Sequence, residues 1–196
     1  MKLLRYTPEW NSTPPEAWRD WQLKQLRDYL HRRVIPFSAH YHRVFEEHDI
    51  QPLDIKSFED WSHVPFTSKK DLANPRDFVL VPDEAVLRRE PGMICTALLH
   101  GRAAAKDQAE AEFRPILLTS TTGRSSDPVP FLYTKHDLHN LDISGSRLML
   151  AGRSQRDFKH INLFPYAPHL AFWLAHHAGL GFGTFMLSTG GGKTLG

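Results

Sequence analysis

Cysteine is almost absent from this chain of 196 residues, and long apolar runs are missing. Cys95 is the single cysteine, which excludes an internal disulfide and a metal site built from paired cysteines. No segment approaches the roughly 18 uninterrupted apolar residues of a membrane-spanning helix. Residues 1–13 also lack the apolar stretch of a secretory signal. We therefore expect a cytoplasmic protein that does not contact a membrane.

A strong excess of charge is missing as well. The formal net charge is +2, and basic residues gather only in isolated pairs at positions 32–33, 69–70 and 88–89. A nucleic-acid-binding surface needs a longer basic stretch or stripe, so no nucleic-acid partner is expected. With 41% hydrophobic residues, the composition is that of a globular protein that can bury a core.

The first part of the chain shows the spacing of amphipathic helices. Aromatic and leucine side chains recur every three or four residues over 15–33 and again over 37–48. Thr13 and Glu16 have the spacing of a capping box at the first helix, and Pro36 is expected to end that helix.

Further helical signals follow. Residues 57–61 predict a short helical turn, and a capped helix is expected to begin at Thr67 or Ser68. The Ala-rich, charged segment 96–112 also favours a helix. We therefore expect residues 1–112 to form an N-terminal helical region.

The pattern changes after Arg114. Short apolar runs at 115–118, 129–133, 161–164 and 182–187 predict strands. A helix capped by Thr134 and Asp137 is expected to end near Gly152, and another is expected over 170–180. This alternation predicts an α/β fold in which residues 113–196 begin a nucleotide-binding subdomain with a mixed or parallel sheet. We expect that sheet to be incomplete, and the chain to be a truncated part of a longer protein.

The hydroxyl- and glycine-rich segment 119–123 directly follows the first predicted strand. Such a loop offers backbone N–H and side-chain O–H groups to an anion, and phosphate accepts several of these hydrogen bonds at once. Arg124 adds a positive charge at its end. From these residues alone, a phosphate site and a polar surface turn are equally favoured.

Residues 118–124 resemble the phosphate-binding loop of the adenylate-forming superfamily, usually written Ser-Gly-Thr-Thr-Gly-Lys-Pro. Motifs similar to those of the phenylacetate–CoA ligase branch occur in the same order along the chain. They are Phe37, Tyr41 and Phe45 for F..Y...F, residues 64–72 for LP.T.KxDL, residues 133–137 for YT..D, residues 164–166 for an aromatic-proline strand end, and residues 188–191 for SGG. The resemblance extends from about Trp18 to Gly192.

This resemblance implies an enzyme that joins a carboxylic acid to ATP, in the presence of Mg²⁺, to give acyl-AMP and pyrophosphate. The acyl group then passes to the thiol of CoA or of a carrier protein. The residues implied to hold the ATP phosphates are Thr119, Ser120, Thr121, Thr122, Gly123 and Arg124. The residues implied to line the acyl pocket are Phe164, Tyr166, His169, Gly190 and Gly191.

The sequence also departs from the family pattern. Ser120 stands where the loop usually has its first glycine, and the segment after Arg124 is longer and carries Asp127. The family's later elements, among them the ribose-binding aspartate and the catalytic lysine, have no counterpart in the chain, so no catalytic residue is assigned. We expect the N-terminal portion of a ligase, inactive alone, that self-associates or needs its missing C-terminal part. The alternative is a non-catalytic remnant or binding module that binds nucleotide at most weakly.

Three other interpretations are disfavoured. The ending Gly192-Lys193-Thr194 is similar to a P-loop, but Leu187 stands where that motif requires a glycine. The twelve histidines do not show the spacing of a metal-ligand set. A serine hydrolase would need a G-x-S-x-G turn, which the sequence does not contain.

Overall fold

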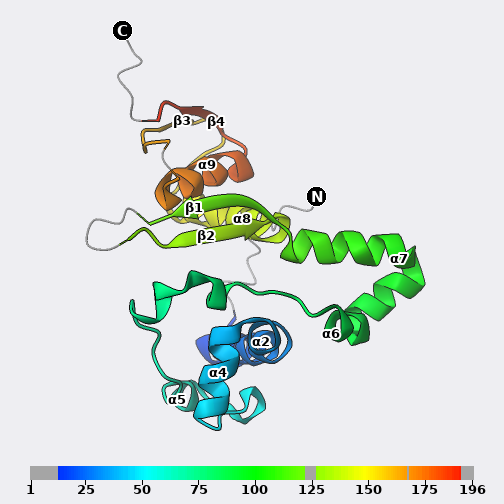
Figure 1. Ribbon diagram of the computed structural model, residues 1–196. Coiled ribbons are helices and arrows are strands. Elements are labelled where there is room, and N and C mark those ends of the chain that lie inside the picture. The colour runs from blue at the N-terminus through cyan, green and yellow to red at the C-terminus, as the bar shows by residue number, and fades with distance from the viewer. Residues whose placement is uncertain (1–12, 122–126, 167, 191–196) are drawn as a thin grey trace. The chain divides into compact units, whose positions relative to one another are not determined.

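The computed structural model describes residues 13–121, 127–166 and 168–190. The chain forms two compact units, and the boundary between them falls between residues 107 and 108. The sequence pattern predicted a helical region over residues 1–112 and a subdomain over residues 113–196. Figure 1 labels the helices and strands of both units.

The first unit begins with one long, interrupted helix. Helix α2 (Pro15–Tyr29) continues into a π-helical turn, η1 (Leu30–Val34), and then into the short α3 (Ile35–Phe37). Pro36 does not end the helix as predicted. Proline lacks an N–H and crowds the carbonyl four residues earlier. A wider π-helical turn, η1, directly precedes this region, and in it the Ile35 N–H donates to the Leu30 carbonyl. The helix then continues through Pro36 to Phe37.

The expected capping box was assigned to Thr13 and Glu16, whereas helix α2 begins at Pro15 directly after Pro14. The residue preceding the helix is Pro14, and the helix begins without a side-chain cap. Two consecutive prolines hold φ near the helical value and remove two N–H groups, which leaves fewer donors for a cap to satisfy.

Helix α4 (Ala39–Glu47) confirms the second predicted amphipathic helix. The Ser38 hydroxyl accepts from the Tyr41 N–H at 3.4 Å and donates to the Asp77 carbonyl at 2.9 Å. Ser38 is 1% exposed, so both hydrogen bonds satisfy a buried polar group. The second bond ties α4 to η4 (Pro75–Phe78).

The core of the first unit gathers where these helices meet the chain that follows. Burial of a full aliphatic or aromatic side chain contributes about 1.5–3 kcal/mol, so this cluster is the main stabilising element of the unit. The buried members are Leu30, Val34, Phe45, Ile55 and Val64.

Short elements complete the first unit. The turn η2 (Pro52–Asp54) precedes α5 (Phe58–Trp61), which confirms the predicted helical turn and has a capping box formed by Ser57 and Asp60. The helix expected from Thr67 or Ser68 is wrong in extent. The Asp71 carboxylate accepts from the Ser68 N–H and hydroxyl, but only the turn η3 (Asp71–Ala73) follows before Pro75.

Helices α6 (Glu84–Arg89) and α7 (Pro91–Phe113) follow. Helix α7 contains the predicted segment 96–112 but is broken at Gly101, where φ is +90°. Only glycine adopts that conformation without strain. Next to the start of α7, Arg33 forms an ion pair with Glu90 at 2.6 Å, and both side chains are largely buried.

The described residues of the second unit form two separate pairs of strands. Strands β1 (Pro115–Ser120) and β2 (Pro130–Thr134) are antiparallel. Strands β3 (Lys159–Asn162) and β4 (Phe185–Ser188) are parallel, with Ile161 opposite Leu187. An isolated bridge between Ser120 and His169 joins the end of β1 to the segment that precedes α9.

Helices α8 (Lys135–Ala151) and α9 (Leu170–Phe182) pack against each other through small residues. A Cβ atom on Gly145 would lie 2.6 Å from the Cα of Ala178, so the two helices approach closely at this point. Figure 1 shows α9, in orange, between the two pairs of strands. The order β3–α9–β4 is a parallel strand–helix–strand unit.

The predicted α/β fold is therefore confirmed, with helical elements first and strands with covering helices after them. The Thr134–Asp137 capping box and the end of α8 at Gly152 are also as predicted. The last predicted strand begins too early, because α9 continues to Phe182 and ends at Gly183 with φ +83°. No helix in the described parts of the chain is long and apolar enough to cross a membrane.

Candidate functional site

The base of the predicted phosphate loop is formed by the end of β1. Thr119 is 0% exposed, and its hydroxyl has no hydrogen-bond partner among the described residues. The Ser120 N–H donates to the Pro168 carbonyl at 2.6 Å, and the Ser120 hydroxyl donates to the same oxygen at 3.1 Å. Thr122, Gly123 and Arg124 lie outside the described residues.

Thr121 closes the base of the loop from the other side. Its N–H donates to the Val129 carbonyl at 3.1 Å, and its hydroxyl accepts from the Val129 N–H at 3.0 Å. The backbone N–H groups of Ser120 and Thr121 are thus both occupied by protein carbonyls. In this geometry the two residues fix the base of the loop. Within the described residues 119–121, the Thr121 hydroxyl proton remains available as a donor, whereas the unpaired Thr119 hydroxyl is fully buried.

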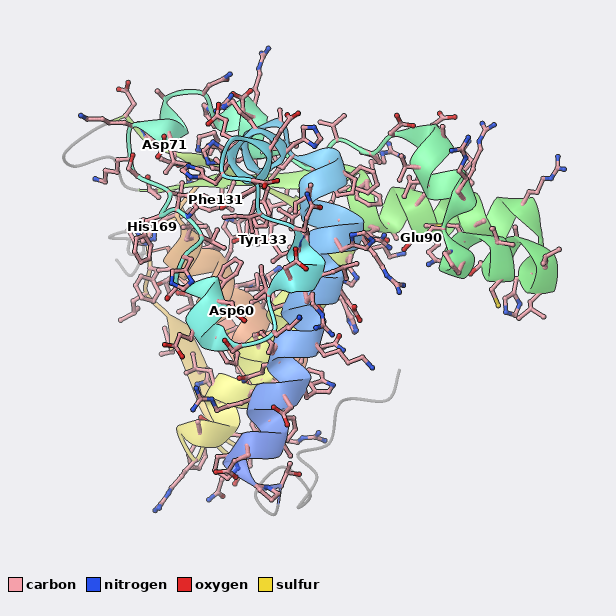
Figure 2. All side chains as sticks on the ribbon, turned by 90° about the horizontal axis from the view of Figure 1, so that it is seen from below. Asp60, Asp71, Glu90, Phe131, Tyr133 and His169 are labelled. Carbon is pink, nitrogen blue, oxygen red and sulfur yellow. The ribbon has the colours of Figure 1, made fainter. Side chains whose placement is uncertain are left out.

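Two of the predicted acyl-pocket residues lie together. The rings of Phe164 and His169 are stacked, with centroids 6.3 Å apart and planes at 17°. His169 also caps α9, because its Nδ1 accepts from the Ala171 N–H at 3.2 Å. Figure 2 labels His169 at the start of this helix. The His169 ring is therefore oriented both by stacking and by a hydrogen bond to backbone.

Tyr166 and Gly190 form a second group. The Tyr166 hydroxyl donates to the Ser188 carbonyl at 2.5 Å, and its ring packs on Phe172 with centroids 4.8 Å apart. Gly190 has φ +69°, and a Cβ atom there would overlap the Tyr166 ring. The structure thus brings Tyr166 to the glycine segment. Gly191 lies outside the described residues.

Asn162 joins these groups and was not singled out from the sequence. It is 3% exposed. Its side-chain amide donates to the Phe172 carbonyl and accepts from the Phe164 N–H, both at 3.1 Å, and its own carbonyl accepts from the Thr189 N–H at 3.1 Å. The sequence did offer one signal for Asn162, namely a polar residue within a short apolar strand. A buried amide in such a place is usually held by several backbone partners.

Two histidines of α9 face neighbouring elements. The His177 Nδ1 lies 2.7 Å from a carboxylate oxygen of Asp142 on α8, and the His176 Nδ1 lies 3.3 Å from the Ser188 hydroxyl. Burial lowers the pKa of His176, and the neighbouring His177 lowers it further. Among the residues that the structure describes, no three histidine, cysteine or acidic side chains come together as a metal site.

A shallow groove of about 360 Å³ runs between β2 and α8. Figure 2 labels two of its lining residues, Phe131 and Tyr133. A third, Asp137, is held in the capping box of Thr134, so it is not free to serve a ligand. The groove contains none of the predicted site residues, although Tyr133 and Asp137 belong to the family-like motif at residues 133–137.

Comparison with known proteins supports the resemblance. No family model matches the chain. A phenylacetate–coenzyme A ligase of Thermus thermophilus is 38% identical over 90 residues, which are 43% of this chain and 19% of that protein.

Two solved structures of 2-hydroxyisobutyryl-CoA ligase share the fold. One is a complex with 2-HIB-AMP and CoA in the thioesterification state, and it matches with a TM-score of 0.68 at 20% identity. The match covers 93% of this chain and 34% of the ligase chain. The other, an open conformation with 2-HIB-AMP and CoA, has a TM-score of 0.65 at 19% identity, covering 91% of this chain and 36% of its own.

The chain therefore spans about a fifth of the curated relative and about a third of the structural neighbours. The sequence match and the fold confirm the predicted resemblance to the N-terminal part of an adenylate-forming acyl–CoA ligase. The roles of individual site residues remain predictions.

Proposed function

We propose that this chain is part of an ATP-dependent ligase that adenylates a carboxylic acid and passes the acyl group to CoA or another thiol. The observation that carries the proposal is the double hydrogen bond from Ser120 to the Pro168 carbonyl. It holds the base of the phosphate loop beside the segment that carries Phe164 and His169. An adenylating site needs this proximity, because the acid must reach the α-phosphorus of ATP.

The proposed chemistry has two steps. A carboxylate oxygen of the acid attacks the α-phosphorus, the bond from that phosphorus to the pyrophosphate oxygen breaks, and acyl-AMP and pyrophosphate form. A thiolate then attacks the acyl carbonyl, and AMP leaves with the electron pair of the broken C–O bond. Both structural neighbours were solved in complex with 2-HIB-AMP and CoA, which supports an acyl-AMP and a thiol as ligands of this reaction.

In this proposal the phosphates are held by the loop from Thr119 to Arg124, as the family resemblance implies. Phosphoryl transfer depends on positioning and on neutralising charge more than on covalent help, which suits a loop fixed at both ends. Mg²⁺ is expected with the nucleotide.

The acid is proposed to lie near Phe164 and His169, next to the glycine segment of Gly190 and Gly191. The stacked pair presents a flat surface, and Phe164 is 46% exposed. Aromatic or branched apolar acids would gain most from such a surface. We therefore propose a hydrophobic carboxylic acid as the substrate class.

A second candidate is a binding module without ligase activity. It is favoured by one observation, namely that the N–H groups of Ser120 and Thr121 already donate to protein carbonyls. A loop with fewer free donors would bind phosphate more weakly. This module would retain the fold and bind nucleotide without converting an acid to acyl-AMP.

The double variant Thr122→Ala/Arg124→Ala tests the loop assignment. Loss of a charge-assisted contact and a hydroxyl contact, each contributing about 1–3 kcal/mol, should weaken ATP binding by at least about tenfold in a titration of the intact protein. Arg156→Ala, an exposed arginine outside the site, is the matched control and should leave affinity unchanged. Equal ATP affinity in the double variant and the wild type would remove the loop from the nucleotide site.

A further inference from the structure

The turn from Ser188 to Gly190 is held by contacts with three other residues, Asn162, Tyr166 and His176. The Thr189 N–H donates to the Asn162 carbonyl at 3.1 Å, and the Ser188 hydroxyl lies 3.3 Å from His176 Nδ1. The Ser188 carbonyl accepts from the Tyr166 hydroxyl at 2.5 Å. Of these contacts, only the last comes from the loop that also carries the predicted acyl-pocket aromatics.

Tyr166 and Gly190 are fitted to each other. Gly190 has φ +69°, which disfavours any residue with a Cβ atom, and an added Cβ would also overlap the Tyr166 ring. The Tyr166 ring also packs on Phe172, which is 2% exposed. The ring is thereby supported by a buried residue of α9 and covers the backbone of the glycine turn.

The same loop contacts the phosphate-loop strand two residues further on. The Pro168 carbonyl accepts both hydrogen bonds of Ser120, and His169 bridges to Ser120 in the backbone. One short segment thus holds the base of the phosphate loop with a carbonyl and holds the glycine turn with the Tyr166 hydroxyl. A change at either contact would alter the spacing between the two loops.

We propose that Tyr166 is a positioning residue, not a wall of the acyl pocket: its hydroxyl fixes the Ser188–Gly190 turn relative to Ser120 at the base of the phosphate loop, so that the acid and ATP are held at the correct separation. This inference rests on the proposed function. Phe164 and His169, which stack on each other, then remain as the aromatic contacts of the acid. Ser120, in place of the usual glycine, acts with Tyr166 by anchoring the other end of the segment to β1.

The first test is Tyr166→Phe in the intact protein, which removes the hydroxyl and keeps the ring. Loss of one hydrogen bond predicts a fall of about 2- to 10-fold in kcat/KM for acid-dependent pyrophosphate exchange. The factor should be the same for small and large acids, and the KM for ATP should stay unchanged. Tyr133→Phe, in the same unit and outside both loops, is the matched control and should behave as wild type.

A loss of kcat/KM that grows with the size of the acid would overturn the proposal. A residue that lines the pocket contacts the substrate and so discriminates by its shape, whereas a positioning residue does not. An unchanged kcat/KM for every acid would also overturn it. These outcomes differ from failure of the proposed function, in which the wild type itself shows no acid-dependent exchange.

A second test needs no ligase activity. Hydrogen exchange of the Thr189 amide should be about 2- to 10-fold faster in Tyr166→Phe than in wild type, while amides in the middle of α8 keep their rates. Gly190→Ala should accelerate exchange in the same turn, and this effect should be smaller when Tyr166 is also alanine, because the ring no longer opposes the new Cβ. Equal exchange at Thr189 in wild type and Tyr166→Phe would show that the hydroxyl does not hold the turn.

Discussion

The two units stabilise themselves in different ways. The unit of residues 8–107 has a cluster of buried aliphatic and aromatic side chains around Phe45, which is 2% exposed. The unit of residues 108–196 relies on close packing of α8 on α9 through Gly145, and it leaves apolar residues exposed on its strands. Parallel strands are usually covered on both faces, yet Phe185 and Ile161 are 69% and 60% exposed.

This difference in packing predicts that the two units respond differently to substitution. The first unit fills its own core, so its stability should depend on side-chain volume. The second unit carries the candidate site, whose residues are held by backbone hydrogen bonds and glycine contacts more than by a filled interior. Substitutions should therefore act through different mechanisms in the two units, and three predictions test this.

The largest effect is expected in the first unit, from Phe45→Ala. Removing a buried phenylalanine should lower the free energy of unfolding by about 3–5 kcal/mol, because transfer energy and cavity cost add. Urea unfolding, with hydrogen exchange read in α2 and α4, measures this. Phe66→Ala is the matched control, since Phe66 is 94% exposed and its loss should change stability by less than about 0.5 kcal/mol. Similar losses from the two variants would contradict the assigned core.

A smaller effect is expected in the second unit, from Gly145→Ala. The added methyl would lie 2.6 Å from the Ala178 Cα and 2.8 Å from its Cβ, so α8 and α9 must move apart, at a cost of about 1–3 kcal/mol. Hydrogen exchange in α8 and α9 measures this cost. Gly92→Ala, where nothing lies within 4 Å of the new Cβ, should be neutral or slightly stabilising. A stabilising Gly145→Ala would rule out the close helix contact.

The smallest effect is a difference in acid sensitivity between the units. Burial lowers the pKa of His176, so the folded second unit favours the neutral ring. The unfolded chain then binds the proton more readily, and stability should fall as pH drops below about 6.5, the ordinary histidine value. In the first unit, hydrogen bonds from Lys56 and Ser57 lower the pKa of Asp60. Its contribution should be lost only as pH falls below about 4.

Unfolding measured between about pH 7 and pH 4, in wild type and His176→Gln, tests this difference. The variant should lose part of the pH dependence of the second unit, and the exposed His136→Gln should retain it. If His176→Gln and the wild type follow the same pH profile, the ring is not held neutral by its burial in α9.

Local signals predicted the fold well where one short stretch decides the structure. Thr134 and Asp137 cap α8 as predicted, because both partners of a capping box lie within one turn. Pro36 misled the prediction, because a π turn precedes it within a continuous helix. The predicted start of β4 at residue 182 is too early for a related reason. Helix α9 ends at Gly183, whose positive φ marks the end of the helix in the structure.

The candidate site was predictable in part. The motifs located the loop after β1 and the aromatic segment, but they could not show that Ser120 bonds to Pro168, 48 residues away. The same holds for Tyr166, whose partner Ser188 is 22 residues away. Contacts over such separations depend on how β3, α9 and β4 pack, and no spacing within one segment encodes them.

The central claim is tested most directly by exchange of labelled pyrophosphate into ATP by the full-length protein of which this chain is proposed to be part, with a panel of aliphatic and aromatic carboxylic acids. The account predicts exchange that requires both Mg²⁺ and an acid, that is strongest with hydrophobic acids, and that is lost in Thr122→Ala/Arg124→Ala. ATP binding without exchange for any acid would contradict the ligase proposal and leave the nucleotide-binding module as the function of this chain.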